Sequence, residues 1–409
     1  MSTLAITLSS PTFRLGALVV AGLFFNAVLA LINAHIMPVG TAHVMACEGL
    51  IIAAAAYTLY PLRDAAMKPW LMLSFGFAIL FVWIVLYNAA LGQSVSPKAL
   101  RDIVLISTFG MVGMAYAKSG GDIIPLIRWI AVAVVGVMLF ENYATELYST
   151  LFQVSSYYLN TRGLDAQALG ASADDILFFN TKLIEGRFSF GFLTSHRLSS
   201  LFLEQTTLGN FAVLLAMTTS VLWEKLTTRD RTILIGSVVL CLLGTDSRIA
   251  FGMALITLLA HTLAPRVPTG LNILTMPFFL LISAFIFYDP KAFTYTNDDL
   301  EGRFEWALTQ MSWIDLQGLL GGRPDMISQS MDSGYSYIVY SQTILGLIAL
   351  WIFTVYISTQ KNLSTRRLTF FLVMFTTINL MVGPTLFSIK TSSLLWFLIG
   401  YMQVKKDKP

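Results

Sequence analysis

The chain has 409 residues, of which 56% are hydrophobic and only 12% are charged, and its net charge is +3. Soluble domains carry about 25% charged residues, so this composition excludes an ordinary soluble domain and predicts an integral membrane protein. The two cysteines, Cys47 and Cys241, lie in apolar runs, which argues against a disulfide framework and against a CxxC metal site.

Twelve apolar segments of membrane-spanning length follow one another along the chain. They cover 13–33, 43–60, 69–87, 103–117, 125–147, 206–223, 231–246, 248–264, 271–288, 334–356, 368–383 and 388–404. About 20 helical residues cross a hydrocarbon core of roughly 30 Å, so the sequence predicts an all-α polytopic protein with about twelve transmembrane helices. The first segment has no convincing cleavage site after it and is predicted to be a retained helix.

The lysines and arginines divide unevenly between the two sets of connections. With both termini in the cytoplasm, the short outer loops hold Lys98, Arg101, Arg248 and Lys390. The inner segments hold Arg14, Arg63, Lys68, Lys118, Arg128, Lys225, Arg229, Arg231, Arg266, Lys361, Arg366, Arg367, Lys405, Lys406 and Lys408. Because cytoplasmic loops carry an excess of Lys and Arg, this bias predicts that both ends lie inside.

This topology leaves two long outer loops, at 148–205 and 289–333. They separate a five-helix N-terminal membrane part at 1–147, a central four-helix part at 206–288, and a C-terminal three-helix part with a cytoplasmic tail at 334–409. Most connections are about 4–6 residues long, and much longer ones are usually functional or disordered. Both loops contain aromatic and aliphatic residues throughout, which predicts ordered structure.

Each long loop contains a signal for the start of a helix. Ser172-Ala173-Asp174-Asp175 predicts a cap for a helix over Ile176–Lys182. Asn297-Asp298-Asp299 predicts a cap for a second helix, from Leu300 to about Trp313.

The second of these helices is predicted to be amphipathic. Residues three and four apart share a helix face. One face collects Arg303, Trp306 and Gln310, and another collects Phe304, Leu308 and Met311. We expect this helix to lie at the outer membrane surface.

The segment Ser195–Glu204, just before the sixth span, is the first candidate for chemistry. If the helix already includes Arg197, then Arg197, Ser200 and Glu204 share one face. Two interpretations remain open. The segment is either an interfacial anchor with an Arg–Glu pair, or it supplies an anion-binding arginine at the mouth of a cavity.

The triplet Asp246-Ser247-Arg248 is the second candidate. It interrupts the apolar stretch from Thr232 to Pro265, which predicts a hairpin of two helices with about 15 residues, or ~23 Å, in each arm. Such arms are slightly too short to reach water, so the charged tip should lie below the membrane surface. A charge there costs about 2.5–3.5 kcal/mol. Either Asp246 and Arg248 neutralise each other, or Arg248 holds something negative.

Two further candidates lie in the second long loop. The glycine-dense stretch Gly318–Pro324 predicts either a close approach of the backbone to a ligand or a plain tight turn. Asp332 opens the tenth span, where it is either a functional carboxylate at the membrane boundary or a helix N-cap. The chain has no HExxH, GxSxG, P-loop or Rossmann fingerprint and no metal-ligand spacing, so we expect no cofactor, no metal and no nucleic-acid partner.

The order of these motifs resembles the Wzy O-antigen and exopolysaccharide polymerases and the related WaaL O-antigen ligases. An Arg-containing segment with a nearby Glu is followed by a T-x-S-R hairpin, here Thr245 to Arg248. A G-R helix with a downstream Trp follows, at Gly302-Arg303 and Trp306, and then a span that opens with a polar pair. The resemblance covers roughly residues 187–356.

The resemblance implies both an activity and a site. Family members act at the periplasmic face of the inner membrane on glycans linked to undecaprenyl diphosphate, and their fold is related to that of the GT-C-like glycosyltransferases, which use lipid-linked sugars. It implies that Arg197, Arg248 and Arg303 hold the diphosphate and that Asp332, or else Glu204, is the base. The expected glycan contacts are His196, Trp306, Arg323 and Tyr335. The expected partners are the lipid-linked glycans and the bilayer, and a chain-length-regulating membrane protein is compatible with them.

One departure favours a polymerase over a ligase. Ligases open the span after the large loop with His-(Asn/Ser/Gln), nine residues and Gly-x-x-Gly. This chain keeps the spacing, with Asp332-Ser333, nine residues and Thr343-Ile344-Leu345-Gly346, but replaces the His by Asp and the first Gly by Thr. A ligase that transfers glycan to lipid A-core, and a flippase or other twelve-helix transporter, are the alternatives.

Overall fold

The structure is a computed structural model that describes residues 10–162, 196–290, 300–358 and 362–404. Within these ranges it is all-helical, without a strand. Seven of the described helices are long and apolar enough to cross a membrane, which is consistent with an α-helical polytopic membrane protein. The predicted helix over Ile176–Lys182 and the predicted cap Asn297-Asp298-Asp299 lie outside the described residues.

Each of the twelve predicted apolar segments coincides with a helix. In chain order these helices are α2 (Pro11–His35), α3 (Thr41–Leu59), α4 (Lys68–Ala90), α5 (Lys98–Lys118), α6 (Ile123–Tyr143), α9 (Gln205–Val221), α10 (Thr228–Thr245), α11 (Arg248–Leu259), α12 (Thr269–Phe287), α16 (Gly334–Tyr356), α17 (Leu363–Leu380) and α18 (Ile389–Val404). The shorter helices are α7 (Thr145–Phe152), α8 (Val154–Arg162), α13 (Leu300–Ser312), α14 (Leu316–Leu319) and α15 (Met326–Gln329). The short helices fall in or beside the two predicted long loops, and α13 confirms the predicted helix from Leu300.

The chain forms two compact units that do not follow the order of the sequence. Unit 1 contains residues 1–62, 115–258 and 389–395, and unit 2 contains residues 63–114, 259–388 and 396–409. Both α5 and α18 contribute residues to each unit.

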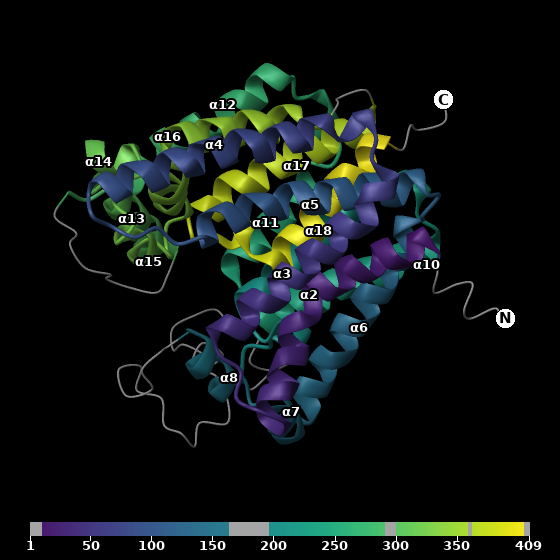
Figure 1. The fold of residues 1–409 in the computed structure, drawn as a ribbon. Coiled ribbons are helices and arrows are strands. Elements are labelled where there is room, and N and C mark those ends of the chain that lie inside the picture. The colour runs from purple at the N-terminus through teal and green to yellow at the C-terminus, as the bar shows by residue number, and fades with distance from the viewer. Residues whose placement is uncertain (1–9, 163–195, 291–299, 359–361, 405–409) are drawn as a thin grey trace. The chain divides into compact units, whose positions relative to one another are not determined.

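Unit 1 is organised around α2 and α10. Helix α2 packs against α3, α7 and α8, and α10 packs against α6 and α9. Figure 1 shows α7 and α8 gathered near the same end of α2. Nη1 of Arg128 lies 2.7 Å from Oδ1 of Asp230, which ties the first turn of α10 to α6.

Unit 2 is organised around α16. This helix packs against α4, α12 and α17, and the short helices α13, α14 and α15 cluster at one end of it (Figure 1). Ser333 caps α16, because its side chain accepts from the amide of Ser336. A kink interrupts α16 at Thr343, which has φ 67° and ψ 169°.

The start of α16 is fixed by a close approach to the end of α17. A Cβ added at Gly334 would lie 2.6 Å from the carbonyl oxygen of Gly383 and 2.9 Å from Cα of Leu380. Both neighbours are backbone atoms, which move only if the helices separate. Glycine is therefore required at this position by packing.

We predict that Gly334→Ala destabilises the protein by about 1–3 kcal/mol, because the added methyl group forces this contact apart. The matched control is Gly270→Ala in the first turn of α12, where an added Cβ meets nothing within 4 Å. That substitution should be neutral or stabilise by up to about 1 kcal/mol, because alanine favours the helix. Thermal unfolding of both variants in detergent tests the difference, and equal effects would contradict the packing argument.

Candidate functional site

The residues from His196 to Glu204 form a turn-rich segment that we call the 196–204 segment. Helix α9 begins only at Gln205, Ser200–Phe202 form a short 3-10 turn, and Leu203 has a left-handed backbone with φ 58°. The condition under which Arg197 and Glu204 would share a helix face is therefore not met. The amides of Ser199 and Ser200 are bound by a carboxylate and do not enter a helical hydrogen-bond pattern.

That carboxylate belongs to Glu141, near the end of α6. Its Oε2 accepts from the amides of Ser199 at 2.9 Å and Ser200 at 2.6 Å, and its Oε1 accepts from Ser199 Oγ at 2.9 Å. Nε2 of His196 lies 3.7 Å from Oε1. Glu141 is fully buried. Hydrogen bonds to an ionised carboxylate are among the stronger ones, so Glu141 determines the path of the 196–204 segment.

Tyr148 of α7 supports the same turn. Its hydroxyl donates to the carbonyl oxygen of Ser200 at 2.7 Å and lies 3.2 Å from Ser199 Oγ. Ser200 Oγ in turn donates to the carbonyl oxygen of Val134 in α6 at 2.6 Å. The turn is therefore held from two helices, and its polar groups are satisfied within the protein.

The 196–204 segment lies directly on the tip of the α10–α11 hairpin. The amide of Leu198 donates to the carbonyl oxygen of Gly244 at 2.8 Å, and Nε of Arg197 donates to the carbonyl oxygen of Thr245 at 3.1 Å. Only 7% of Arg197 is exposed. The first two candidate groups of the sequence thus meet in unit 1.

The predicted break into two helices is confirmed, and the connection between α10 and α11 is short. Asp246 follows α10 with a left-handed backbone, φ 48° and ψ 38°, and it is buried. Ser247 caps α11, because its Oγ accepts from the amide of Ala250 at 3.3 Å. Arg248 is the first residue of α11 and is exposed. The two charged residues of the tip therefore lie in different environments.

Glu204 pairs with Arg162 and not with Arg197. Nη2 of Arg162 lies 3.0 Å from Glu204 Oε1, and Nζ of Lys390 lies 3.7 Å from Oε2. Burial opposes the charge on Glu204. The two cations, together with hydrogen bonds from Arg162 and Thr207, outweigh this effect and lower the pKa of Glu204 to about 2.

The remaining predicted residues lie in unit 2. Arg303 and Trp306 are half-buried on α13, and the Trp306 ring meets the Trp313 ring edge-on at 5.4 Å. Arg323 pairs with Asp315 and Asp325 at 3.2 and 3.3 Å. Gln310, predicted to share a face with Arg303, is buried, and its amide donates to the carbonyl oxygen of Gln329.

Two predictions at the start of α16 are resolved. Asp332 is exposed, and the N-cap is Ser333, so the capping interpretation of Asp332 is wrong. Tyr335 is fully buried, and its hydroxyl donates to the carbonyl oxygen of Thr377 at 2.9 Å. A ring enclosed in this way has no face for a sugar, so Tyr335 is corrected from a glycan contact to a core residue.

The glycine-dense stretch is a tight turn packed against α4. The carbonyl oxygen of Gly321 accepts from the side-chain amide of Asn88 at 2.7 Å. Gly321 has φ 81°, and a Cβ on Gly322 would lie 2.5 Å from the Tyr87 ring. Of the two interpretations left open by the sequence, this packing favours the structural one.

Four residues around this segment were not among the site residues predicted from the sequence: Glu141, Tyr158, Arg162 and Lys390. Glu141 and Lys390 lie inside predicted apolar segments, Tyr158 and Arg162 lie in the first long loop, and their partners are up to 232 residues away in the chain. The signal that could have identified Glu141 and Lys390 was the presence of a charged residue within an apolar segment. Glu141 and Lys390 are both costly in apolar surroundings unless they are paired.

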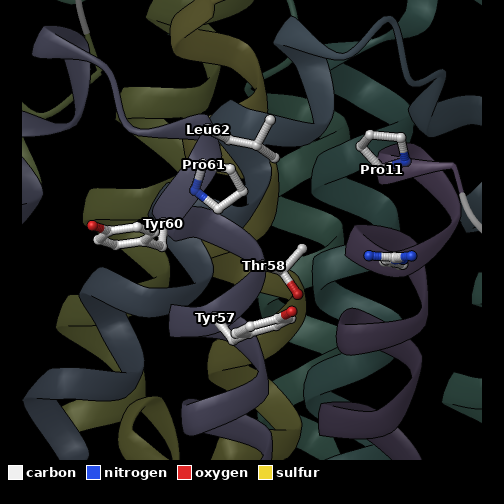
Figure 2. A pocket seen from close by; sticks show the side chains of 7 residues that line it. Pro11, Tyr57, Thr58, Tyr60, Pro61 and Leu62 are labelled. Carbon is white, nitrogen blue, oxygen red and sulfur yellow. The ribbon is translucent and has the colours of Figure 1, made fainter.

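A pocket of ≈ 320 Å³ lies elsewhere in unit 1, where α2 begins and α3 ends. It is lined by Pro11, Arg14, Tyr57, Thr58, Tyr60, Pro61 and Leu62, most of which Figure 2 labels. None of the predicted site residues borders it. Within the described residues, no group of three or more His, Cys, Asp or Glu side chains is arranged to hold a metal ion.

Comparison with known proteins adds no relative: no family model, no curated protein and no solved structure matches the chain.

We predict that Glu141→Gln lowers stability by about 1–3 kcal/mol, because the new amide nitrogen faces donors and leaves them unsatisfied. The matched control is Glu146→Gln on α7, where the side chain is exposed, and it should stay within about 0.5 kcal/mol of wild type. Thermal unfolding gives both values. A Glu141→Gln protein as stable as the control would show that the 196–204 segment does not depend on this carboxylate.

Proposed function

We propose that the chain is a polymerase of polyprenyl-diphosphate-linked oligosaccharide repeat units in surface polysaccharide biosynthesis. The observation that carries the proposal is the contact between the 196–204 segment and the α10–α11 hairpin. Arg197 is buried and hydrogen-bonded on the tip, and α11 begins there with Arg248. An arginine bound at the tip and a second one that opens the next helix suit a diphosphate, because arginine binds phosphate oxygens in a fork and stays charged at any working pH.

In the proposed reaction, these arginines stabilise the diphosphate as it leaves. The acceptor hydroxyl attacks the anomeric carbon of the donor sugar, the bond from that carbon to the diphosphate oxygen breaks, and the diphosphate leaves with its electron pair. Charge therefore develops on the leaving oxygen. Donors held in a partly water-excluded place stabilise such a charge strongly. The sugar arrives already activated by its lipid diphosphate, so the reaction needs no nucleotide.

The hydroxyl proton requires a base, and the two candidates now differ. A carboxylate with a pKa of about 2 that is engaged by two cations is a weak base, which counts against Glu204. Asp332 is exposed and is not needed as a cap. Asp332, which belongs to unit 2, therefore stays the prediction for the base.

The backbone at Thr343 supports the motif correspondence. Polymerase-related ligases carry glycine at the position that matches Thr343. The φ of 67° and ψ of 169° found here belong to a region that is otherwise almost restricted to glycine. Thr343 has thus kept a glycine-like conformation at the spacing that the family uses.

The proposal includes the twelve-span topology in the bacterial inner membrane, with both termini cytoplasmic and the site facing the periplasm. The positive-inside bias supports this orientation. In this topology the protein contacts the bilayer and binds the lipid-linked glycans.

The decisive experiment supplies purified protein with lipid-linked repeat units and no nucleotide sugar. We expect longer glycans on the lipid, and we expect Arg248→Ala to abolish elongation while the protein remains inserted. Arg248→Lys should also be poor, because a point charge lacks the fork of a guanidinium. Arg229→Ala, at the other end of the same hairpin, is the matched control and should elongate normally. Unchanged glycan length with wild-type protein defeats the proposal, and transfer only to lipid A-core would make the protein a ligase.

Asp332→Asn tests the base in the same assay. Because Ser333 is the cap, the substitution should leave the unfolding temperature unchanged. We expect elongation to fall about 100-fold or more, the typical contribution of general base catalysis. Asp325→Asn, an exposed carboxylate near α16, is the matched control. Normal elongation by Asp332→Asn would remove Asp332 from the mechanism.

A further inference from the structure

A second cationic group lies at the other end of the 196–204 segment. Arg162, at the end of α8, and Lys390, at the start of α18, both lie within 4 Å of the Glu204 carboxylate. Lys390 also donates to the carbonyl oxygen of Phe202 at 2.8 Å and to the hydroxyl oxygen of Tyr158 at 3.2 Å. Three elements that are distant in the sequence thus meet around one carboxylate.

The two cations have different surroundings. The Lys390 side chain is 4% exposed, and its ammonium group donates to Phe202 and Tyr158 and lies 3.7 Å from Glu204 Oε2. The Arg162 side chain is 39% exposed, and its guanidinium lies over the Tyr158 ring at 4.3 Å. Among the described residues, that guanidinium donates a single hydrogen bond, to Glu204. Arginine has five N–H donors, so most of those on Arg162 make no hydrogen bond to a described residue.

The two cations share one carboxylate. Glu204 lies 3.0 Å from Arg162 and 3.7 Å from Lys390, so Lys390 competes with Arg162 for its negative charge. A positively charged guanidinium that is stacked on a ring and held at one nitrogen has a fixed orientation. Such a group is prepared to bind a phosphate, because little side-chain freedom remains to be lost on binding.

We infer that Arg162 contacts the diphosphate of a second lipid-linked substrate, the acceptor, in a subsite separate from the hairpin tip. This inference rests on the proposed function, in which two lipid diphosphates are bound at once and only one of them leaves. The leaving diphosphate requires a water-excluded arginine, and Arg197 is 7% exposed. The acceptor diphosphate stays intact, so its arginine only has to bind and orient it, and the more exposed Arg162 suits that role.

Lys390 is a positioning residue in this scheme. It holds Glu204 and the carbonyl oxygen of Phe202, and the carboxylate in turn orients Arg162. Tyr158 supplies the aromatic surface under the guanidinium. The 196–204 segment therefore has one arginine site at each end, with Arg197 on the hairpin and Glu204 beside Arg162.

Binding of farnesyl diphosphate to the full chain in detergent tests the inference without any polymerase activity. Wild type should bind two equivalents. Arg162→Gln and Arg248→Gln should each lose one of them, with the affected site about tenfold to hundredfold weaker, as expected for the loss of a charged hydrogen bond. Arg162→Lys should restore part of the binding. Arg128→Gln breaks a comparable Arg–Asp pair on α6 and should still bind two equivalents.

Three results would overturn the inference. Arg162→Gln could bind farnesyl diphosphate with wild-type affinity and stoichiometry. Farnesol could bind the Arg162 subsite as well as farnesyl diphosphate does, which would show that the charge is irrelevant. Inorganic pyrophosphate could bind as tightly as farnesyl diphosphate, which would assign the subsite to a soluble diphosphate. Absence of elongation with two-site binding intact would defeat the proposed polymerase but not the Arg162 subsite.

Discussion

The Glu141 carboxylate is the interaction on which the candidate site depends. It is buried in unit 1 and binds the amides of Ser199 and Ser200, which diverts the chain from the helix that would otherwise begin earlier. With that turn in place, Arg197 reaches the hairpin tip at one end and Glu204 reaches Arg162 at the other. A buried carboxylate costs free energy unless it is fully hydrogen-bonded, and here the backbone amides supply those bonds. The same bonds that satisfy Glu141 also position both arginine groups.

The helices were predictable because apolar periodicity and length carry the information. Every predicted apolar segment is a helix, since a run of about 20 apolar residues has few other ways to satisfy its backbone in a membrane. The length of the apolar stretch was enough to predict two helices that meet at Asp246-Ser247-Arg248. Helix α11 nevertheless ends at Leu259, before the predicted end at residue 264, because helix ends depend on local hydrogen bonds that composition does not encode.

The site was only partly predictable, for a physical reason. Arg197 and Arg248 stood out as charges near apolar segments. The contact of Arg197 with Thr245 nevertheless depends on Glu141, a residue more than 50 positions earlier in the chain. Tyr335 was misjudged because an aromatic residue at a helix start suits a membrane interface and a protein core equally well. Asp332 was misjudged as a candidate cap because Ser333 beside it is an equally good cap, and only the structure distinguishes the two.

The kink at Thr343 has a consequence for how α16 tolerates change. Before the kink, all residues from Gly334 to Thr343 are buried, and they include Tyr335, Ser336 and Tyr337. After it, Leu345, Ile348 and Ile352 are exposed on one face. The first half is thus surrounded by protein, whereas the second half presents an apolar stripe of the kind that lipid accepts. Substitutions among aliphatic residues should accumulate in the second half over evolutionary time, while the first half should vary little. The two halves of this one helix should therefore accumulate substitutions at different rates, with the boundary at Thr343.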